Sequence, residues 1–509
     1  TDSALMTLSN SPAGGFGGAL AFNREELWVG AASAGHYGGI AVFEFDAYRT
    51  SWSMSQSLVP YRLPRGASVG NPLAVKGDIG IGAAPRSGWY GEAIVFQRDL
   101  NGVWWEDESL TATGLDLDAI VGGKLDCEGG KADQFNCEGI ELLSFLPVSD
   151  IGGGAGSTAA DIWGWTDPET GREYVLANRN DGTAFVDVTD PENPVFIGDL
   201  PMTETAVANL WRDVKTYKNY ALIVADNVGV HGMQIFDLRQ LRDVENPPVT
   251  FEPTVLYSEI NSAHNVIVNE ETGFAYIVGA SDGGNTCGGA LHMVDINDPL
   301  NPTFAGCFDN PTRPSGIHDS QCVTYRGPDE RFTGREICLS SDGDMLSIAD
   351  VTDKANPEQL VTISYPDEGY AHQGWLTDDQ RYFYQNDEGD ELVTDFGGTR
   401  TLIWDLQELD DPILTGQYIA ENKASDHNLY IRGNLMYESN YVSGLRIIDI
   451  SDPVAPKEVG HLDTVPWGED LPGFAGSWSN YPFFESGTIA VSSIREGLFL
   501  VRKTDDVVP

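Results

Sequence analysis

The sequence has 509 residues, and its 30 Lys and Arg against 77 Asp and Glu give a formal charge of -47. A surface of this sign repels phosphate, so nucleic acid and anionic membrane surfaces are not expected as partners. No apolar run reaches the roughly 18 residues of a membrane span, so no span is expected. The chain is longer than one ordinary core of roughly 250 to 300 residues, which favours a repeat architecture.

Residues 1–106 contain two copies of one pattern, about 54 residues apart. A Gly-rich segment and a following strand at 15–18 and 28–31 match those at 70–72 and 81–83, and each copy continues into an apolar strand. These copies resemble the FG-GAP repeats of integrin-type propellers, without the Asp-x-Asp-x-Asp-Gly calcium loop. Two such units cannot close a ring alone. They either dock on a second ring or join it to make a nine-bladed one.

Residues 107–139 are Gly-rich and acidic and are predicted to connect the two repeat regions. They contain the first of three close cysteine pairs. Six cysteines allow fifteen connectivities, and their spacing favours neighbours: Cys127 with Cys137, Cys287 with Cys307, and Cys322 with Cys338. The spacings differ from the CxxC of zinc sites, so disulfides formed in an oxidising compartment are expected. The sequence therefore predicts an extracellular or cell-surface protein.

A second repeat, again with a period of about 54 residues, follows. Each copy has a short apolar run, a second run, and a third run that ends in Asp, and four copies begin with a histidine: His264, His318, His372 and His427. The third run often continues as Asp-x-x-Asp-Pro, and a proline there belongs to a turn because it cannot donate to a ladder. The same phase places further first strands near Ile162, Val214 and Trp478. This pattern predicts an all-β fold with a seven-bladed β-propeller at residues 140–503, each blade having four strands.

The last predicted blade, which starts at Trp478, has only three strands before a polar tail at residues 504–509. A missing fourth strand would leave an open sheet edge. Residues 140–148 form a spare strand before the first blade. This strand is predicted to pair with the last blade and to close the ring.

Longer motifs in this region resemble a known family. They read DIWGWTDP at 161–168, LWRD at 210–213, GYAHQGWL at 369–376 and DHNLY at 426–430. Together they resemble the choice-of-anchor B family, bacterial surface proteins with LVIVD-type repeats. The resemblance covers about residues 137–502. It implies export and attachment to the cell surface, and it implies no particular activity.

The repeated histidines are the candidate site. Starts of inner propeller strands form a ring at one mouth of the central channel, so His264, His318, His372 and His427 are expected to converge there. Asp161 and Asp213 come from the two preceding blades at nearly the same phase. Imidazoles with nearby carboxylates suit a transition metal, here Fe, Cu, Zn or Mn. The alternative is that each histidine makes a structural hydrogen bond within its own blade. The histidines off this phase are expected to be ordinary surface or core residues: His36, His231, His292 and His461.

Acidic loops at 341–344 and 386–391 are candidates for Ca²⁺, or they are solvated turns. Glu388, in the second loop, follows the second strand of the His372 blade, a place from which it can reach the channel mouth. No Walker loop, GxSxG, HExxH or dinucleotide-binding GxGxxG motif is present, which argues against a nucleotide-dependent enzyme.

Two functions remain. One is a metal-binding surface propeller, with catalysis as an extracellular metalloenzyme left open. The other is an adhesion or binding scaffold with structural histidines and calcium-stabilised loops. Either would have an extracellular ligand, whether a glycan, a protein or a small molecule.

Overall fold

The computed structural model describes residues 14–24, 26–33, 38–46, 51–59, 69–84, 92–99, 102–111, 117–154, 156–281, 286–309 and 316–504. Nearly all regular structure in these ranges is β-strand, which confirms the all-β prediction. The chain divides into two compact units, Thr1–Asp116 and Leu117–Pro509. Two predicted features, His36 and the tail beyond residue 504, lie outside the described residues.

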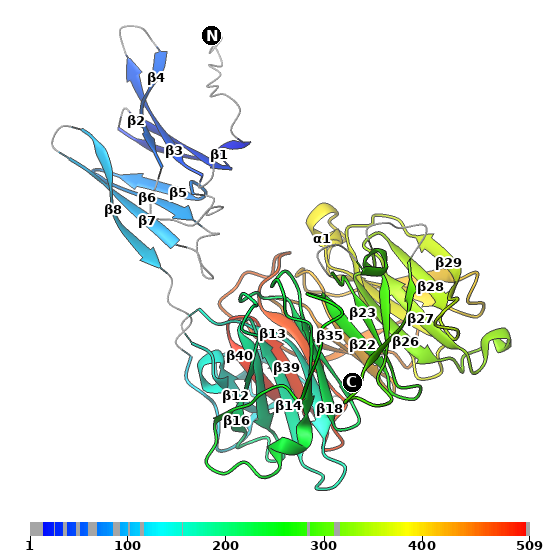
Figure 1. Ribbon diagram of the computed structural model, residues 1–509. Coiled ribbons are helices and arrows are strands. Elements are labelled where there is room, and N and C mark those ends of the chain that lie inside the picture. The colour runs from blue at the N-terminus through cyan, green and yellow to red at the C-terminus, as the bar shows by residue number, and fades with distance from the viewer. Residues whose placement is uncertain are drawn as a thin grey trace. The chain divides into compact units, whose positions relative to one another are not determined.

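The first unit contains two antiparallel sheets, each with four strands in chain order. They are β1 (Gly14–Asn23), β2 (Glu26–Ser33), β3 (Ile40–Asp46) and β4 (Ser51–Leu58), and then β5 (Leu73–Lys76), β6 (Ile79–Ala84), β7 (Glu92–Arg98) and β8 (Trp104–Thr111) (Figure 1). β8 extends beyond residue 106, where the sequence placed the end of this region.

One aromatic cluster joins the two sheets of the first unit. The ring of Trp28 in β2 lies edge-to-face against Phe96 of β7 and Trp104 of β8, with centroids 5.8 and 4.8 Å apart. Trp28 also lies so close to Gly80 that a Cβ there would come within 2.2 Å of the indole. The two repeats of residues 1–106 therefore share a core, and a residue larger than glycine at position 80 would displace its central side chain.

The second unit contains seven sheets among its described residues. The first five sheets follow one another along the chain, except that β20 joins the first sheet from after β19. They are β13 (Ala159–Thr166), β14 (Glu173–Arg179), β15 (Gly182–Asp187), β16 (Val195–Pro201) and β20 (Val249–Thr250); β17 (Arg212–Tyr217), β18 (Tyr220–Ala225), β19 (Met233–Asp237) and β21 (Val255–Tyr257); β22 (Asn265–Asn269), β23 (Phe274–Val278), β24 (Leu291–Asp295) and β25 (Thr303–Phe308); β26 (Asp319–Thr324), β27 (Glu336–Ser341), β28 (Met345–Asp350) and β29 (Glu358–Ser364); and β30 (Ala371–Leu376), β31 (Tyr382–Asp387), β32 (Arg400–Asp405) and β33 (Ile413–Ile419).

The last two sheets each recruit strands from residues 125–147. The sixth contains β34 (Leu429–Arg432), β35 (Leu435–Ser439), β36 (Leu445–Asp449), β37 (Lys457–Leu462), β11 (Phe135–Glu138) and β10 (Lys131–Ala132). The seventh contains β38 (Ser477–Tyr481), β39 (Ile489–Ser493), β40 (Gly497–Lys503), β12 (Ile140–Pro147) and β9 (Leu125–Asp126). The part of the predicted connection from residue 117 onward therefore belongs to the second unit and extends its sheets.

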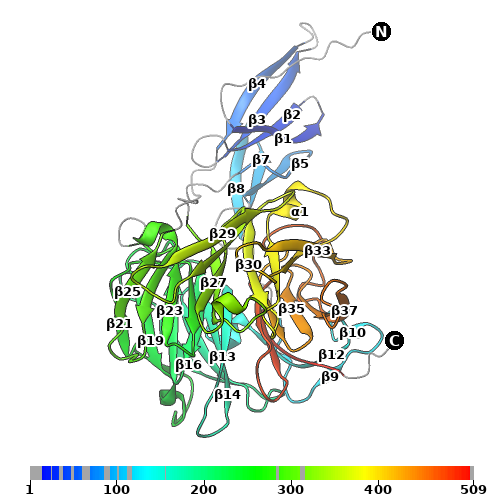
Figure 2. The same cartoon turned by 90° about the vertical axis from the view of Figure 1, so that its right-hand side faces the viewer.

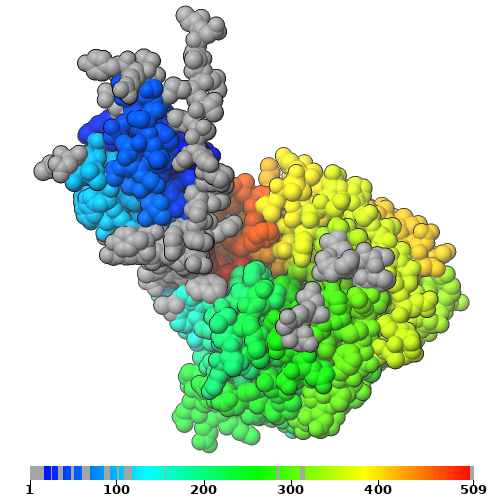
Figure 3. Space-filling view, turned by 45° about the horizontal axis from the view of Figure 1, so that its top comes forward, coloured from blue at the N-terminus to red at the C-terminus, as the bar shows by residue number. Residues whose placement is uncertain are grey.

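The seven sheets follow one another in a closed succession. Their first strands, β13, β17, β22, β26, β30, β34 and β38, each contact the next, and β38 contacts β13. β12 pairs antiparallel with β40, which gives the last sheet its fourth strand (Figure 1). Figure 2 shows the successive sheets from a second side, and the surface of this unit changes from green through yellow to orange in chain order (Figure 3).

Turns and disulfides fix the connections between strands. In the Asp-x-x-Asp-Pro turn after β15, Asp187 accepts hydrogen bonds from the Thr189 amide and hydroxyl at 3.0 and 2.6 Å. The cysteines pair as the spacing predicts, Cys127–Cys137, Cys287–Cys307 and Cys322–Cys338. Short helical segments are η1 (Val148–Ile151), η2 (Leu238–Leu241), η3 (Thr286–Gly289), η4 (Glu330–Phe332) and α1 (Asp390–Val393). Among the described residues no helix has the length and apolar character needed to cross a membrane.

Candidate metal centre

The four repeated histidines form one stack at the N-terminal ends of four successive first strands. His264, His318 and His427 lie just before or at the start of β22, β26 and β34, and His372 lies in β30. Ring centroids are 4.5 Å apart for His264 and His318, 4.3 Å for His318 and His372, and 4.1 Å for His372 and His427. The four side chains therefore lie next to one another in chain order, and His318 and His372 fall within one candidate ligand group.

Three of the four rings have a hydrogen-bond acceptor at Nδ1. Nδ1 of His318 lies 2.9 Å from the carbonyl oxygen of His372, and Nδ1 of His427 is hydrogen-bonded to the carbonyl of Trp478. Nδ1 of His264 instead lies 2.9 Å from the Asp226 carboxylate. An Nδ1–H that donates to such an acceptor leaves the lone pair on Nε2, the arrangement usual in metal-binding histidines.

His372 repeats this arrangement less well than its neighbours. The backbone of His427 is close enough to affect the pKa of the His372 ring. Nδ1 of His372 nevertheless has no hydrogen bond of good geometry among the described residues. The His372 ring is nevertheless buried between those of His318 and His427.

Glu388 completes a three-residue group with two of the histidines. One ring nitrogen each of His318 and His372 and a carboxylate oxygen of Glu388 lie within 4.8 Å of one another. Ligands held roughly 2.0–2.3 Å from one ion are at most about 4.6 Å apart, so a small side-chain movement would bring all three to bonding distance. Two imidazoles and one carboxylate form a donor set that suits Fe, Zn, Cu or Mn.

A tyrosine also holds the Glu388 carboxylate. The Tyr441 hydroxyl donates a 2.9 Å hydrogen bond to it, and Nε2 of His372 lies 3.9 Å from the same oxygen. A cavity of about 410 Å³ adjoins the group and is lined by His264, His318 and Glu388 among others. An ion bound here would therefore face a space large enough for water or a small ligand.

Burial controls protonation at the centre. Burial and the neighbouring imidazoles lower the pKa of both His318 and His372 well below the usual value, so these rings are neutral at physiological pH. Burial raises the pKa of Glu388 to about 7. Metal ligation requires neutral imidazole and ionised carboxylate. The histidines are already in the required state, and an ion would displace a proton from Glu388.

The structure separates Asp161 and Asp213 from this centre, contrary to expectation. Both carboxylates hold the ammonium of Lys215, at 3.0 and 2.5 Å. Asp213 also accepts a 2.7 Å hydrogen bond from the amide of Val266. These partners occupy the two aspartates, which are not part of the three-residue group of His318, His372 and Glu388. His264 and His427 remain in the stack, but their nitrogens lie outside the three-residue group.

Glu388 was not among the transition-metal ligands predicted from sequence. Its loop was a candidate for Ca²⁺ and was placed within reach of the channel mouth. The adjacent Asp387 accepts hydrogen bonds from the Gly369 and Gly389 amides at 2.8 and 3.1 Å and from the Tyr365 hydroxyl. Asp387 therefore closes the turn that places Glu388 beside the histidines. The loop's position after the second strand of the His372 repeat was the only sequence signal for this placement.

The three described histidines off the repeat phase have local partners. His231 lies 2.8 Å from the Gly232 carbonyl, His292 bonds the Tyr257 hydroxyl at 2.8 Å, and His461 pairs with Glu458 at 3.0 Å. Burial, with nearby Arg212, lowers the pKa of His231 to about 4.

Comparisons with known proteins bear on the fold. A family model described as the LVIVD repeat matches residues 426–464, which include His427 and strands β34 to β37. No curated protein matches the sequence. The matched repeat and the closed succession of sheets indicate the same fold. The second unit is a β-propeller.

Solved structures that resemble the chain do so weakly. The β-propeller domain of Myceliophteria thermophila Cps50 is 11% identical, with a TM-score of 0.41 over 65% of this chain and 93% of that one. A functionally unknown protein from Desulfotomaculum acetoxidans is 10% identical, with a TM-score of 0.39 over 66% and 89%. A hypothetical selenium-binding protein from Sulfolobus tokodaii is 10% identical, with a TM-score of 0.40 over 60% and 82%.

Proposed function

We propose that this chain is a secreted or cell-surface propeller that binds one transition-metal ion through His318, His372 and Glu388. The observation that carries the proposal is the three-residue group, whose donor atoms lie within 4.8 Å of one another. The acceptor at Nδ1 of His318 supports it, because an imidazole that donates from Nδ1 keeps its lone pair on Nε2. Fe, Cu, Zn and Mn all fit two nitrogens and one oxygen.

Catalysis is a natural extension of this site. Three protein ligands leave coordination positions open, and an open position lets a metal activate water or oxygen. The adjoining cavity of about 410 Å³ would admit the molecule to be transformed. The protein would then be an extracellular metalloenzyme.

We further propose seven blades, and two additional FG-GAP-like sheets in the first unit. The contacts between successive first strands, including β38 with β13, support seven blades. The assignment of β1–β8 to a separate compact unit favours this arrangement over a nine-bladed ring. Secretion and surface attachment are supported by three disulfides and by the resemblance to choice-of-anchor B proteins.

Elemental analysis of natively purified full-length protein tests the metal proposal. We expect about one transition-metal ion per chain in the wild type and in a control, His461→Ala, because His461 is engaged by Glu458 away from the stack. We expect no stoichiometric metal in the His318→Ala, His372→Ala double variant. Unchanged metal content in the folded double variant would refute the proposal, as would a wild type without stoichiometric metal.

One observation favours the alternative function, a binding scaffold with calcium-stabilised loops. Asp426 is completely buried, and neither of its carboxylate oxygens has a hydrogen-bond partner in the described part of the chain. Burial and the carboxylates of Glu391 and Asp390 raise its pKa well above the usual value. Ca²⁺ binds such oxygen groups and would offset their charge.

Thermal unfolding with Ca²⁺ or with a calcium chelator tests this alternative. If calcium binds at Asp426, Ca²⁺ raises Tm in the wild type and raises it less in Asp426→Asn. Equal Tm values in Ca²⁺ and chelator would contradict calcium binding. Because the readout is stability rather than transition-metal content, the two proposals fail separately.

A further inference from the structure

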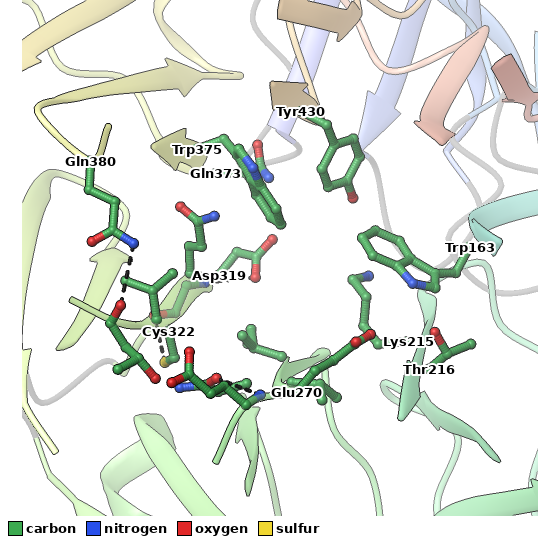
Figure 4. A pocket seen from close by; sticks show the side chains of 18 of the residues that line it. Trp163, Lys215, Thr216, Glu270, Asp319, Cys322, Gln373, Trp375, Gln380 and Tyr430 are labelled. Carbon is green, nitrogen blue, oxygen red and sulfur yellow. Dashed lines mark hydrogen bonds between the residues drawn. The ribbon is translucent and has the colours of Figure 1, made fainter. Parts of the chain in front are cut away.

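A second cavity lies at the opposite end of the same first strands. His264 precedes β22 and Glu270 follows it, and His318 precedes β26 while Arg326 follows it. The cavity, about 330 Å³ in volume, is lined largely by residues from the later parts of these strands, and also by Asp319, the first residue of β26, which follows His318 (Figure 4). Its walls include Trp163, Lys215, Glu270, Asp319, Trp375 and Tyr430. It shares no lining residue with the histidine-lined cavity.

Three aromatic rings form one wall. The Tyr430 ring lies edge-to-face with Trp163 and with Trp375, at centroid distances of 5.5 and 5.0 Å. Phe483 lies 6.0 to 6.3 Å from all three rings. Figure 4 shows Trp163, Trp375 and Tyr430 grouped around the open centre of the cavity. Because each ring contacts two others, the wall is held in place before a ligand arrives.

The amides that line the cavity are used by the protein itself. Gln373 both donates to and accepts from the backbone of Leu429, at 3.0 Å each. Gln380 accepts a 2.6 Å hydrogen bond from the amide of Arg326. These bonds join neighbouring sheets. The amides are therefore poor candidates for the paired donors and acceptors that a sugar ring requires.

The carboxylates are less engaged than the amides. Asp319 accepts a 2.7 Å hydrogen bond from the next amide, that of Ser320. The side chain of Glu270 has no hydrogen-bond or ion-pair partner in the described part of the chain. The groups still free to meet a ligand are thus aromatic rings and carboxylate oxygens.

Carboxyl groups outnumber cationic side chains beside the cavity. The Lys215 ammonium is held by Asp161 and Asp213 and lies within electrostatic reach of Asp319. The other cation at the rim, Arg326, is matched by Glu271 at 2.6 and 2.8 Å. One ammonium therefore lies among three carboxyl groups, and Glu270 adds a fourth carboxyl group at the rim.

The cavity already holds one ammonium, that of Lys215, against the face of an aromatic ring, and a cationic ligand would bind by the same cation–π attraction. Nζ of Lys215 lies 4.7 Å from the ring centroid of Trp163, a cation–π distance. Cation–π attraction and nearby carboxylates together select organic cations, whereas a bare metal ion needs several converging oxygens. We propose that the cavity bounded by Trp163, Trp375, Tyr430, Asp319 and Glu270 binds a small organic cation of the alkylated ammonium class.

Calorimetric titration of the full-length protein tests this proposal with three probes. Choline is the cation, 3,3-dimethyl-1-butanol is its uncharged analogue of the same shape, and methyl glucoside represents sugars. We expect choline to bind and the uncharged analogue to bind at least about tenfold more weakly. Equal binding of the two shapes, preference for methyl glucoside, or no choline binding would overturn the proposal.

Variants locate the site. Asp319→Asn keeps the side-chain shape and should weaken choline binding about tenfold, and Trp375→Leu should weaken it by a similar factor. Trp467→Leu is the matched control, since Trp467 is exposed and does not line the cavity. Circular dichroism identifies any variant that fails to fold, and Asp319→Asn then carries the test. Unchanged choline affinity in folded Asp319→Asn would place the binding elsewhere and refute the assignment.

Discussion

Two regions beside the first strands differ in how their buried polar groups are arranged. The histidine end is the stack of four histidines, and the aromatic end is the cavity lined by Trp163, Trp375 and Tyr430. At the histidine end, one residue type recurs in four sheets, and each ring stacks on the next. At the aromatic end, one lysine gathers aspartates from the sheets of β13 and β17, and the aromatic rings come from β13, β30 and β34 and from the loop beyond β38. A repeated position produces a row of identical groups, whereas positions that vary between repeats produce a unique pocket.

The largest effect is expected from breaking the ion cluster at the aromatic end. Lys215→Met leaves Asp161 and Asp213 buried without their cation, and loss of one partner of a buried ion pair costs about 3 to 5 kcal/mol of unfolding free energy. Urea denaturation measures this loss. The matched control is Lys218→Met, because Lys218 is exposed and its replacement should change stability by about 0.5 kcal/mol or less.

A rescue experiment sharpens this result. Adding Asp161→Asn and Asp213→Asn to Lys215→Met removes the uncompensated charges, so most of the lost stability should return. If Lys215→Met costs no more than Lys218→Met, the aromatic end is not held together by its charges, and the contrast between the two ends disappears.

The next effect concerns a buried acid near the histidine end. Glu438 in β35 pairs with Leu429, close to His427, and burial raises its pKa to about 7. A raised folded-state pKa means that the folded protein keeps a proton that the unfolded chain releases. The stability contributed by this group is complete below about pH 4.5 and is lost as the pH rises through about 7.

Glu438→Gln removes this dependence on pH. At pH 8 the variant should unfold with a higher free energy than the wild type, by an amount on the order of 3 kcal/mol at most, and near pH 4 the two should agree. Denaturant titrations across this range measure the difference. A difference that does not vary with pH would show that Glu438 keeps an ordinary pKa in the folded protein.

The repeated features of the molecule could be predicted from sequence because repetition makes them visible. First strands near Ile162, Val214 and Trp478 correspond to β13, β17 and β38, and a strand count indicated that residues 140–148 were spare. The histidine stack follows from one repeated position on neighbouring strands. The cysteine pairs are also local, since each links neighbouring segments of chain.

The particular partners of each side chain could not be predicted in the same way. Residues one position apart on a strand point to opposite sides, so nearly the same phase did not place Asp161 and Asp213 beside the histidines. Lys215, which holds them, lies on a single strand and has no counterpart in the histidine pattern. Glu388 comes from a loop whose turn depends on Asp387. The aromatic cavity likewise requires rings from separate sheets, which no single repeat contains.

At the histidine end, the third prediction removes the carboxylate of the proposed metal group. Glu388→Gln preserves shape but replaces an anionic oxygen donor, so metal affinity should fall about 100-fold or more. Competition with a metal chelator measures the affinity. Glu421→Gln, at an exposed site, should leave it unchanged. Equal affinities in wild type and Glu388→Gln would remove Glu388 from the centre and leave the histidines as a structural stack.

The smallest effect tests whether the centre depends on support from a second layer of residues. Tyr441→Phe removes only the 2.9 Å hydrogen bond to Glu388, while the ring can still pack against His427 and Trp478. Loss of an outer hydrogen bond of this kind typically costs about tenfold in metal affinity, and the folded stability should change little by comparison. A purely structural role for Tyr441 would reverse this order, with a loss of stability and no change in metal affinity. The same variant should leave choline binding at the aromatic end unaltered, because Tyr441 does not line that cavity.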